Sequence, residues 1–268
     1  NANASEKLLH DLAWINSESL QDFVPNTSFT ATNEIVFLQY TSGSTNQPKG
    51  VMVCHDNLLH NCELVADHEK PIAVTWLPQH HDMGLIGYYI YMALSGGTTY
   101  GFSPTTFIQN PALWLETITK YKATASSAPN FAFDLCVEDR RFTNEVLGTF
   151  DLSSLKVLMA AAEPIKPDTF ENFLRKYEPY GLKKDSFFVA YGLAEFTIAV
   201  SFYGRRYLSL HKGELAEGNV RPINSASQVS ERIRVMSCGT LLGDNRVCII
   251  NPENGAIAPN HQEGEIWL

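Results

Sequence analysis

The stretch Tyr40–Val51, YTSGSTNQPKGV, concentrates hydroxyl side chains, glycines and one lysine in a loop that follows the apolar run EIVFLQ. Backbone N–H groups, hydroxyls and an ammonium can together hold a polyphosphate. The candidate donors are the hydroxyls of Thr41, Ser42, Ser44 and Thr45, the N–H groups around Gly43, and the ammonium of Lys49. A Walker A loop does not fit, because Gly50 follows the lysine and a strand is expected next. Taken alone, a loop of this composition is more often a solvated turn.

A second polar cluster, His80-His81-Asp82, lies in WLPQHHDMGLIG between a predicted strand and a predicted apolar helix. Its residue types suit a metal site, an acid/base pair or a helix cap. Neighbouring residues of an extended segment point to opposite sides, which disfavours joint binding of one metal ion by His80 and His81. We therefore place a helix cap formed by Asp82 first among these roles.

Two further stretches place a carboxylate just after a predicted buried strand. Glu163 lies in MAAAEP, at the edge of the sheet where open α/β sheets bind ligands. In VAYGLAEFT, a turn presents Tyr191, Gly192 and Glu195. Tyr191 could stack on a purine, and Glu195 could hold Mg²⁺, which favours one or two carboxylates together with phosphate oxygens. The alternatives are a core tyrosine and a glutamate at the start of a helix.

The elements that must position these residues alternate along the chain. Strand patterns cover residues 34–40, 50–54, 72–77, 98–102, 155–161 and 187–191, and helical patterns cover residues 55–67, 83–94, 110–122, 131–139 and 166–177. Asn110 as cap and Pro111 at the first helical position mark one helix start. This alternation predicts an α/β fold with a mainly parallel sheet flanked by helices.

The pattern changes near residue 202. The chain then becomes polar and weakly periodic, and the runs IRVMSCG, NRVCIINPENG and GEIWL predict a β-rich C-terminal segment. We expect a lead-in segment at 1–30, an α/β core at 31–201, an insertion-like polar segment at 202–235 and the start of a truncated β-rich subdomain at 236–268. The chain ends within a strand-like run at Leu268, which suggests a piece of a longer protein.

Bulk composition excludes several classes of protein. The 268 residues are 44% hydrophobic and 18% charged, which predicts a globular chain with a substantial core. A net charge of −9 disfavours nucleic acid or an anionic membrane as a general partner. Five scattered cysteines without a C-x-x-C pair predict neither a disulfide framework nor a zinc ribbon, and favour the cytoplasm. The longest apolar run, residues 84–94, is too short for a transmembrane segment, and no signal peptide pattern opens the chain.

The loop at residues 40–51 resembles the phosphate loop of the adenylate-forming superfamily, which includes acyl-CoA synthetases, luciferases and peptide-synthetase adenylation domains. The stretch WLPQHHDMGLIG resembles the fatty acyl-AMP ligase version of a further superfamily motif. The resemblance covers nearly all of the chain, which corresponds to part of the large N-terminal domain of a complete ligase. Asn46 stands where many members carry glycine, and it tolerates a left-handed backbone better than most residues.

The resemblance implies a role for each motif. The loop would hold the β- and γ-phosphates of ATP, with Lys49 on the leaving pyrophosphate. His81 would lie near the carboxylate of the acyl substrate, and Glu195 would hold Mg²⁺. The remaining implied nucleotide-binding residues are Ala162, Glu163, Pro164, Tyr191, Gly192 and Leu193.

The activity that the resemblance implies is ATP-dependent conversion of a fatty acid to acyl-AMP, for transfer to an acyl carrier protein or polyketide synthase module. The segment Phe202–Arg234 looks like the insertion that disfavours the coenzyme A step in fatty acyl-AMP ligases, although it could be an ordinary surface excursion. Because the chain ends before the family's ribose-binding aspartate and catalytic lysine, we expect little or no activity from it alone.

Two alternatives remain. The first is an acyl-CoA ligase. The second is a non-catalytic nucleotide- or acyl-binding module of the same fold, which is motivated by Ala160, Ala161 and Phe196. These residues replace the family's asparagine, glycine and small residue.

Overall fold

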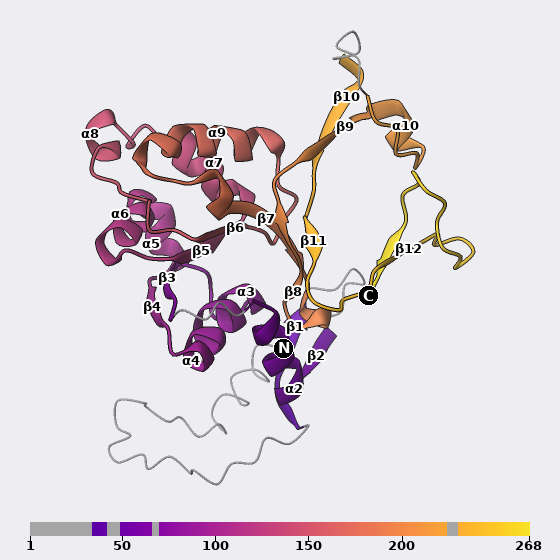
Figure 1. Cartoon of the computed structure of the whole chain (residues 1–268), viewed down its shortest axis with the longest axis horizontal. Coiled ribbons are helices and arrows are strands. Elements are labelled where there is room, and N and C mark those ends of the chain that lie inside the picture. Colours follow the sequence, from indigo (N-terminus) through magenta and orange to yellow (C-terminus); the bar gives the residue numbers. More distant parts are fainter. Residues whose placement is uncertain (1–33, 42–48, 66–69, 224–229) are drawn as a thin grey trace, which may run out of the picture. The chain divides into compact units, whose positions relative to one another are not determined.

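A seven-stranded sheet in the order β11-β8-β7-β6-β5-β3-β4 forms the centre of the fold (Figure 1). The computed structural model describes residues 34–41, 49–65, 70–223 and 230–268, which belong to one compact unit. The strands of the sheet are β3 (Ile72–Thr75), β4 (Thr98–Gly101), β5 (Ala125–Ala128), β6 (Val157–Ala160), β7 (Phe187–Gly192), β8 (Ala199–Gly204) and β11 (Thr240–Leu241). Strands β4, β3, β5, β6 and β7 run parallel, whereas β8 and β11 pair antiparallel. The predicted α/β fold with a mainly parallel sheet is confirmed.

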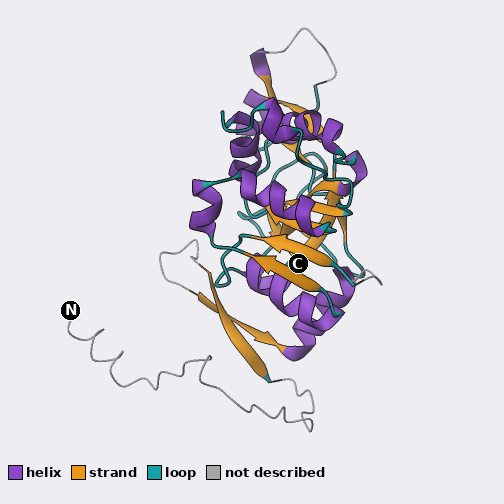
Figure 2. Ribbon diagram, turned by 90° about the vertical axis from the view of Figure 1, so that its left-hand side faces the viewer, coloured by secondary structure: helices purple, strands orange, loops and turns teal. Residues whose placement is uncertain are grey.

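Helices lie on both sides of this sheet (Figures 1 and 2). The helices are α2 (His55–Val65), α3 (Asp82–Leu85), α4 (Tyr91–Ser95), α5 (Pro104–Gln109), α6 (Ala112–Tyr121), α7 (Asn130–Glu138), α8 (Asn144–Leu147), α9 (Pro167–Tyr177) and α10 (Lys212–Ala216). Short helical turns are η2 (Ile86–Ile90), η3 (Glu178–Tyr180), η4 (Lys184–Ser186) and η5 (Ala194–Phe196). None of the helices in the described part of the chain has the length and apolar character needed to cross a membrane.

The face covered by α6, α7 and α9 is closely packed. Phe133 of α7 and Phe173 of α9 lie against Phe187 of β7, with ring centroids 5.1 and 5.3 Å apart. On α6, the Trp114 indole donates a hydrogen bond of 2.9 Å to the Ser126 hydroxyl of β5. Buried aromatic contacts of this kind fix the sheet from one side, so that the other side can remain partly open.

The opposite face is packed less completely. Val157 and Met159 point to this face from β6, the middle strand, yet both are only partly buried. The covering layer consists of α2 and the continuous segment α3-η2-α4, which the sequence predicted as one helix over residues 83–94. Its middle turn, η2, is π-helical, an irregularity that often marks functional sites. A Cβ on Gly84 would lie 2.2 Å from the Pro78 carbonyl oxygen, so this segment can pack here only with glycine.

Some predicted local features are wrong. Asn110 does not cap α6, because it ends α5, and Pro111 precedes the first residue of α6 without a side-chain cap. The sequence analysis missed α5 although its start signal is present: the Ser103 hydroxyl accepts a hydrogen bond of 3.1 Å from the Thr106 N–H, and Pro104 follows the cap. The short helix α8 was also missed.

In the part of the chain that the structure describes, three further pairs of strands lie outside the main sheet. They are β1 (Ile35–Thr41) with β2 (Lys49–Cys54), β9 (Tyr207–His211) with β10 (Arg232–Met236), and β12 (Cys248–Ile250) with β13 (Glu265–Trp267). The strands after residue 231 confirm the predicted β-rich C-terminal segment. The bounds of the four predicted segments stay predictions.

Candidate active site

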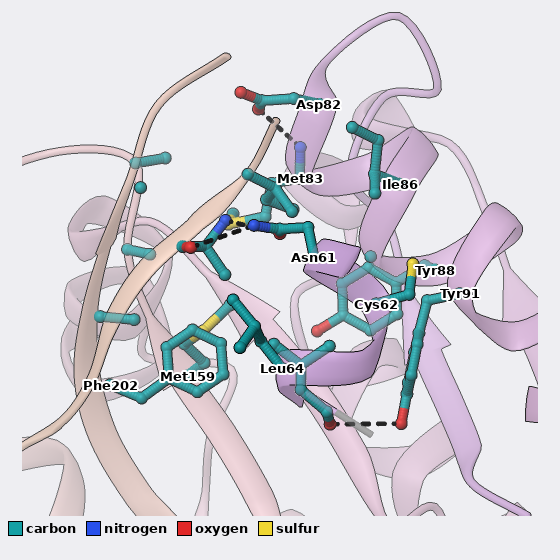
Figure 3. A pocket seen from close by; sticks show the side chains of 18 of the residues that line it. Asn61, Cys62, Leu64, Asp82, Met83, Ile86, Tyr88, Tyr91, Met159 and Phe202 are labelled. Carbon is teal, nitrogen blue, oxygen red and sulfur yellow. Dashed lines mark hydrogen bonds between the residues drawn. The ribbon is translucent and has the colours of Figure 1, made fainter. Parts of the chain in front are cut away.

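A pocket of about 870 Å³ lies between the open face of the sheet and the layer formed by α2 and α3-η2-α4 (Figure 3). The sheet contributes Val157 and Met159 of β6 and Phe188 and Ala190 of β7. Alternate residues of a strand point to the same face. The pocket therefore runs along these strands, from their carboxyl ends towards their amino ends.

Most of the predicted site residues that the structure describes meet at one end of this pocket. Those that line it are Thr41, His81, Ala162, Tyr191, Gly192, Leu193 and Glu195. Ala162 follows β6, and Tyr191 lies at the end of the neighbouring parallel strand β7. Parallel strands end at the same edge, which is where open α/β sheets bind ligands. We call this end of the pocket the polar edge.

Other predicted residues are placed differently. Lys49, Glu163 and Pro164 are not among the residues that line the pocket. Lys49 pairs with Thr41 in the β1–β2 ladder, so it lies next to a lining residue. Ser42, Gly43, Ser44 and Thr45 lie outside the described residues, and so does Asn46.

The hydroxyl of Thr41 fits a site for a polar ligand. Its Oγ1 is buried and has no hydrogen-bond partner among the described residues, although Thr41 lines the pocket. A buried hydroxyl without a partner is unfavourable by about 1–3 kcal/mol. A phosphate oxygen at this position would satisfy it.

The loop MAAAEP is held in one conformation by contacts with α7. Ala162 has a φ of 71°, in the left-handed region that alanine rarely adopts. The Glu163 carboxylate accepts a hydrogen bond of 2.9 Å from the Phe131 N–H in the first turn of α7, where a negative charge is favourable. The Asn130 side chain accepts another, of 2.8 Å, from the Lys166 N–H. Glu163 therefore holds the loop in place beside the pocket.

The end of β7 and the turn after it contribute an aromatic ring and a carboxylate to the pocket. A Cβ on Gly192 would lie 1.7 Å from the Ile198 carbonyl oxygen, so the turn can close only over glycine. Glu195 is exposed and lies in η5. Burial raises the pKa of Tyr191, with smaller contributions from Cys238 and Glu195, so its phenol stays neutral.

His81 and Asp82 form a pair at the start of α3. His81 precedes the helix, whereas Asp82 is its first residue, so the predicted capping residue is displaced by one position. The Asp82 carboxylate nevertheless accepts a hydrogen bond of 2.6 Å from the Met83 N–H, and it lies 2.6 Å from Nδ1 of His81. The hydrogen bond to Asp82 raises the pKa of His81 against an opposing effect of burial. Since Nδ1 cannot donate and accept at once, the short contact favours Nδ1–H donating to Asp82 over accepting from Met83.

The rest of the pocket is mostly apolar, and we call it the channel. Its walls include Leu64, Met83, Ile86, Tyr91, Met159 and Phe202 (Figure 3). Cys62 also lines it, and burial raises the pKa of this thiol to about 11. A thiol with so high a pKa is protonated at neutral pH and therefore a poor nucleophile.

The channel reaches the opposite edge of the sheet. Lys70, Thr124 and Lys156 line it there, at the amino ends of β3, β5 and β6. Lys156 and Ala161 flank β6 at its two ends and both line the pocket; five residues of extended chain correspond to about 17 Å at a strand rise of about 3.3 Å per residue. We call the end of the channel at Lys70, Thr124 and Lys156 the far mouth. The polar edge and the far mouth are thus separated by the length of the strands.

No cluster of three or more His, Cys, Asp or Glu side chains suited to a metal ion occurs in the described part of the chain. Glu195 is the one predicted metal ligand, and it is exposed at the polar edge. A single carboxylate suits Mg²⁺ when phosphate oxygens supply further ligands. The residues present therefore fit a Mg²⁺ ion that arrives with a nucleotide.

Sequence reasoning missed the pocket residues of α2. Leu58, Asn61 and Cys62 are the buried residues of this helix, and their spacing places them on one face. An asparagine within a buried stripe is a signal, because buried amides need hydrogen-bond partners. Asn61 has such partners 135 or more residues away in the chain.

The sequence is similar to known proteins. The sequence matches the family of AMP-binding enzymes over residues 3–268. It is 39% identical over 245 residues to the medium-chain-fatty-acid–acyl-carrier-protein ligase JamA of Moorena producens, an alignment that covers 88% of this chain and 41% of the relative. It is 33% identical over 269 residues to a 4-hydroxyphenylalkanoate adenylyltransferase of Mycobacterium marinum, covering 96% of this chain and 42% of the relative.

A solved structure is also similar. The crystal structure of a fatty acyl-adenylate ligase from L. pneumophila, in complex with acyl adenylate and pyrophosphate, superposes with a TM-score of 0.80 at 38% identity and covers 89% of this chain and 43% of that one. The chain thus spans less than half the length of each of these proteins. Because the family match covers nearly all of its residues, the chain belongs to the family of AMP-binding enzymes.

Proposed function

We propose that the protein activates a fatty acid with ATP to form acyl-AMP and pyrophosphate. The observation that supports this best is a single pocket that joins a polar edge, lined by Thr41, His81, Tyr191 and Glu195, to an apolar channel. The polar edge suits a nucleotide and the channel suits an acyl chain. The carboxylate of the chain and the phosphates of the nucleotide meet where the two parts join.

In this reaction an oxygen of the fatty carboxylate attacks the α-phosphorus of ATP. The new P–O bond forms as the bond to the pyrophosphate oxygen breaks, and the electron pair leaves with pyrophosphate. Both reactants are anions, so the protein must neutralise charge and hold them in line. Lys49 and the loop at residues 40–51 bind the leaving pyrophosphate, and Tyr191 stacks on the adenine.

His81 lies beside the acyl carboxylate in this proposal. Its hydrogen bond to Asp82 raises its pKa and favours the imidazolium form, which attracts an anion. Glu195 would hold Mg²⁺, with phosphate oxygens of ATP as further ligands. When bound, the ion neutralises charge that develops on the phosphates.

The dimensions of the channel limit the length of the chain that it can enclose. An extended chain advances about 1.2 Å per bond, judged from the span of an extended backbone, so a 17 Å channel encloses at most about 14 bonds. A medium-chain fatty acid, the substrate named for the similar ligase of Moorena producens, would fit within this limit. The far mouth at Lys70 and Lys156 offers an exit for a longer chain.

An acyl carrier protein, free or within a polyketide synthase module, is the proposed acceptor, and the cytoplasm is the proposed location. The similarity to an acyl-carrier-protein ligase supports the carrier protein. The segment proposed as the insertion contains β9, α10 and most of β10, and Arg234 pairs there with Asp168 and Glu171 of α9. A segment tied to the core in this way suits the role of restraining a further domain. The weak activity expected of the chain alone stays a prediction.

The test is an assay of the full-length protein with ATP, Mg²⁺ and a radiolabelled fatty acid, with and without coenzyme A. We expect acyl-AMP that persists when coenzyme A is added and decays when an acyl carrier protein is added. Conversion to acyl-CoA would instead identify an acyl-CoA ligase. Absence of any acyl product, with retained nucleotide binding, would favour a binding module.

A further inference from the structure

Asn61 joins α2 to the turn that carries Glu195. Its side chain is buried, with 2% of its surface exposed, and it lines the pocket between the polar edge and the channel. The amide oxygen accepts a hydrogen bond of 3.0 Å from the Ala199 N–H. The amide nitrogen donates to the carbonyl oxygens of Ala199 at 3.2 Å and Phe196 at 3.4 Å.

This arrangement imitates a neighbouring strand. In an antiparallel ladder, two opposed residues exchange an N–H and a C=O hydrogen bond. The primary amide of Asn61 makes the same exchange with Ala199, the first residue of β8, and has a second N–H left for Phe196. One side chain thus satisfies three backbone groups on both sides of Thr197.

The turn that Asn61 holds is strained. Thr197 has φ 68° and ψ −65°, and the Ile198 N–H donates to the Phe196 carbonyl at 2.8 Å. These values describe the rarer form of the γ-turn, which is unfavourable for a β-branched residue. Such a conformation costs about 1–3 kcal/mol and persists only where the surrounding structure fixes it. Asn61 supplies this constraint from α2, and the close approach of Gly192 to Ile198 supplies it from β7.

Glu195 lies two residues before the strained residue. Its side chain is exposed at the polar edge, so it has no buried surroundings to orient it. The position of its carboxylate therefore depends on the backbone of residues 194–199. That backbone is fixed at its far end by the hydrogen bonds of Asn61.

We propose that Asn61 is a positioning residue, which holds the turn so that the Glu195 carboxylate meets the metal ion of the nucleotide. This inference rests on the proposed function in one respect, namely that Glu195 binds Mg²⁺ with ATP. The effect of Asn61 is transmitted through Phe196 and Ala199.

The experiment uses the full-length protein and compares Asn61→Leu, Asn61→Asp and the wild type. Leucine has nearly the same shape and removes all three hydrogen bonds, whereas aspartate keeps the acceptor and removes both donors. Glu63→Gln is the control, because Glu63 is exposed on the same helix. Binding of ATP is measured by calorimetry at graded Mg²⁺ concentrations, and exchange of the amide hydrogens of residues 193–202 is measured by mass spectrometry.

We expect both Asn61 variants to raise the Mg²⁺ concentration needed for ATP binding by about 10- to 100-fold, the range found when residues that orient metal ligands are replaced. Binding of ATP without Mg²⁺ should change less than about twofold by the same reasoning, and exchange at residues 193–202 should become faster. The control should match the wild type in both measurements. If Asn61→Leu prevents folding, Asn61→Asp allows the same comparison with the wild type, because it alters the side chain less.

Two results would overturn the proposal. One is faster exchange in the turn with an unchanged Mg²⁺ requirement, which is what a purely structural role predicts. The other is unchanged exchange and an unchanged requirement. Failure of the proposed function is distinguishable, because in that case the wild type would itself show no Mg²⁺-dependent binding of ATP.

Discussion

The polar edge and the channel of the same pocket are built from different kinds of backbone. The polar edge is formed by the ends of strands and by the turns that follow them, and two residues other than glycine in these turns, Ala162 and Thr197, have φ values of 71° and 68°. Regular elements, α2 and the strands β6 and β7, form much of the channel. Left-handed backbone at such residues costs about 1–2 kcal/mol. The polar edge must therefore hold groups in one geometry, whereas the channel needs mainly apolar volume.

The largest effect is expected from Glu195→Gln. The variant keeps the shape of the side chain and removes the charge that holds Mg²⁺, so the rate of acyl-AMP formation should fall by about 10² to 10³. The measurement is the rate of radiolabelled acyl-AMP formation by the full-length protein at saturating ATP. Glu178→Gln is the control, because Glu178 is exposed in η3, after the end of α9. A loss of less than threefold, by the same standard, would show that Glu195 is not a metal ligand in the reaction.

Gly192→Ala should give the next largest effect, on stability. The added methyl group would lie 1.7 Å from the Ile198 carbonyl oxygen, so the turn must move, and we expect unfolding to become easier by more than about 3 kcal/mol. Urea unfolding of the full-length protein measures this. Gly255→Ala is the matched control: Gly255 has a φ of 70° but nothing within 4 Å of the added Cβ, so only about 1 kcal/mol is at stake. Equal losses in the two variants would mean that the close contact at Gly192 is unimportant.

A change in the channel should be milder and selective. Val157→Phe fills the far half of the channel, and we expect kcat/KM for the longest accepted fatty acids to fall about 10-fold while shorter chains are unaffected. The assay compares fatty acids of increasing length with the wild type and with Val157→Ala, which should extend the accepted length. A uniform loss over all chain lengths would show that Val157 does not limit the channel. It would also weaken the distinction between the two parts of the pocket.

The fold class was predictable because strand and helix patterns alternate over a long part of the sequence. The parallel strands β3, β4, β6 and β7 and the helices α2, α6, α7 and α9 follow from buried runs bounded by polar residues, whereas the small residues of β5 give no such run. Boundaries were less certain where two signals overlap. Asparagine is a residue type that often caps the start of a helix, but Asn110 ends α5 immediately before α6 begins. A short stretch of sequence does not show which of these two roles the residue has.

The candidate site was predictable only where residues follow strands of one sheet. Tyr191, Glu195 and Ala162 share an edge because parallel strands end together, and that rule needs no knowledge of side chains. The channel could not be predicted in this way, since Met159, Phe202 and Leu64 look like ordinary core residues. The link from Asn61 to Ala199 spans 138 residues, and no local pattern encodes such a contact.

The smallest expected effect concerns pH. The pKa of His81 is raised in the folded protein by its hydrogen bond to Asp82, relative to an ordinary value of about 6.5. The folded state therefore binds the proton more tightly than the unfolded state does. The stability that this pair contributes is fully present below about pH 6.5 and is lost as pH rises through the higher folded pKa. Because the His81 side chain is half exposed, solvent weakens the interaction.

Urea unfolding of the wild type and of His81→Gln, measured between about pH 6 and pH 9, isolates this contribution. The wild type should lose more stability than the variant as pH rises, and Asp82→Asn should remove the difference, since the histidine then has no carboxylate partner. Parallel curves for the wild type and His81→Gln would mean that the pair does not favour the protonated form. The chain-length preference set by Val157 should not change over this range, because no charge is needed to hold an apolar chain. A pH dependence confined to the polar edge would thus separate the two parts of the pocket by chemistry as well as by backbone.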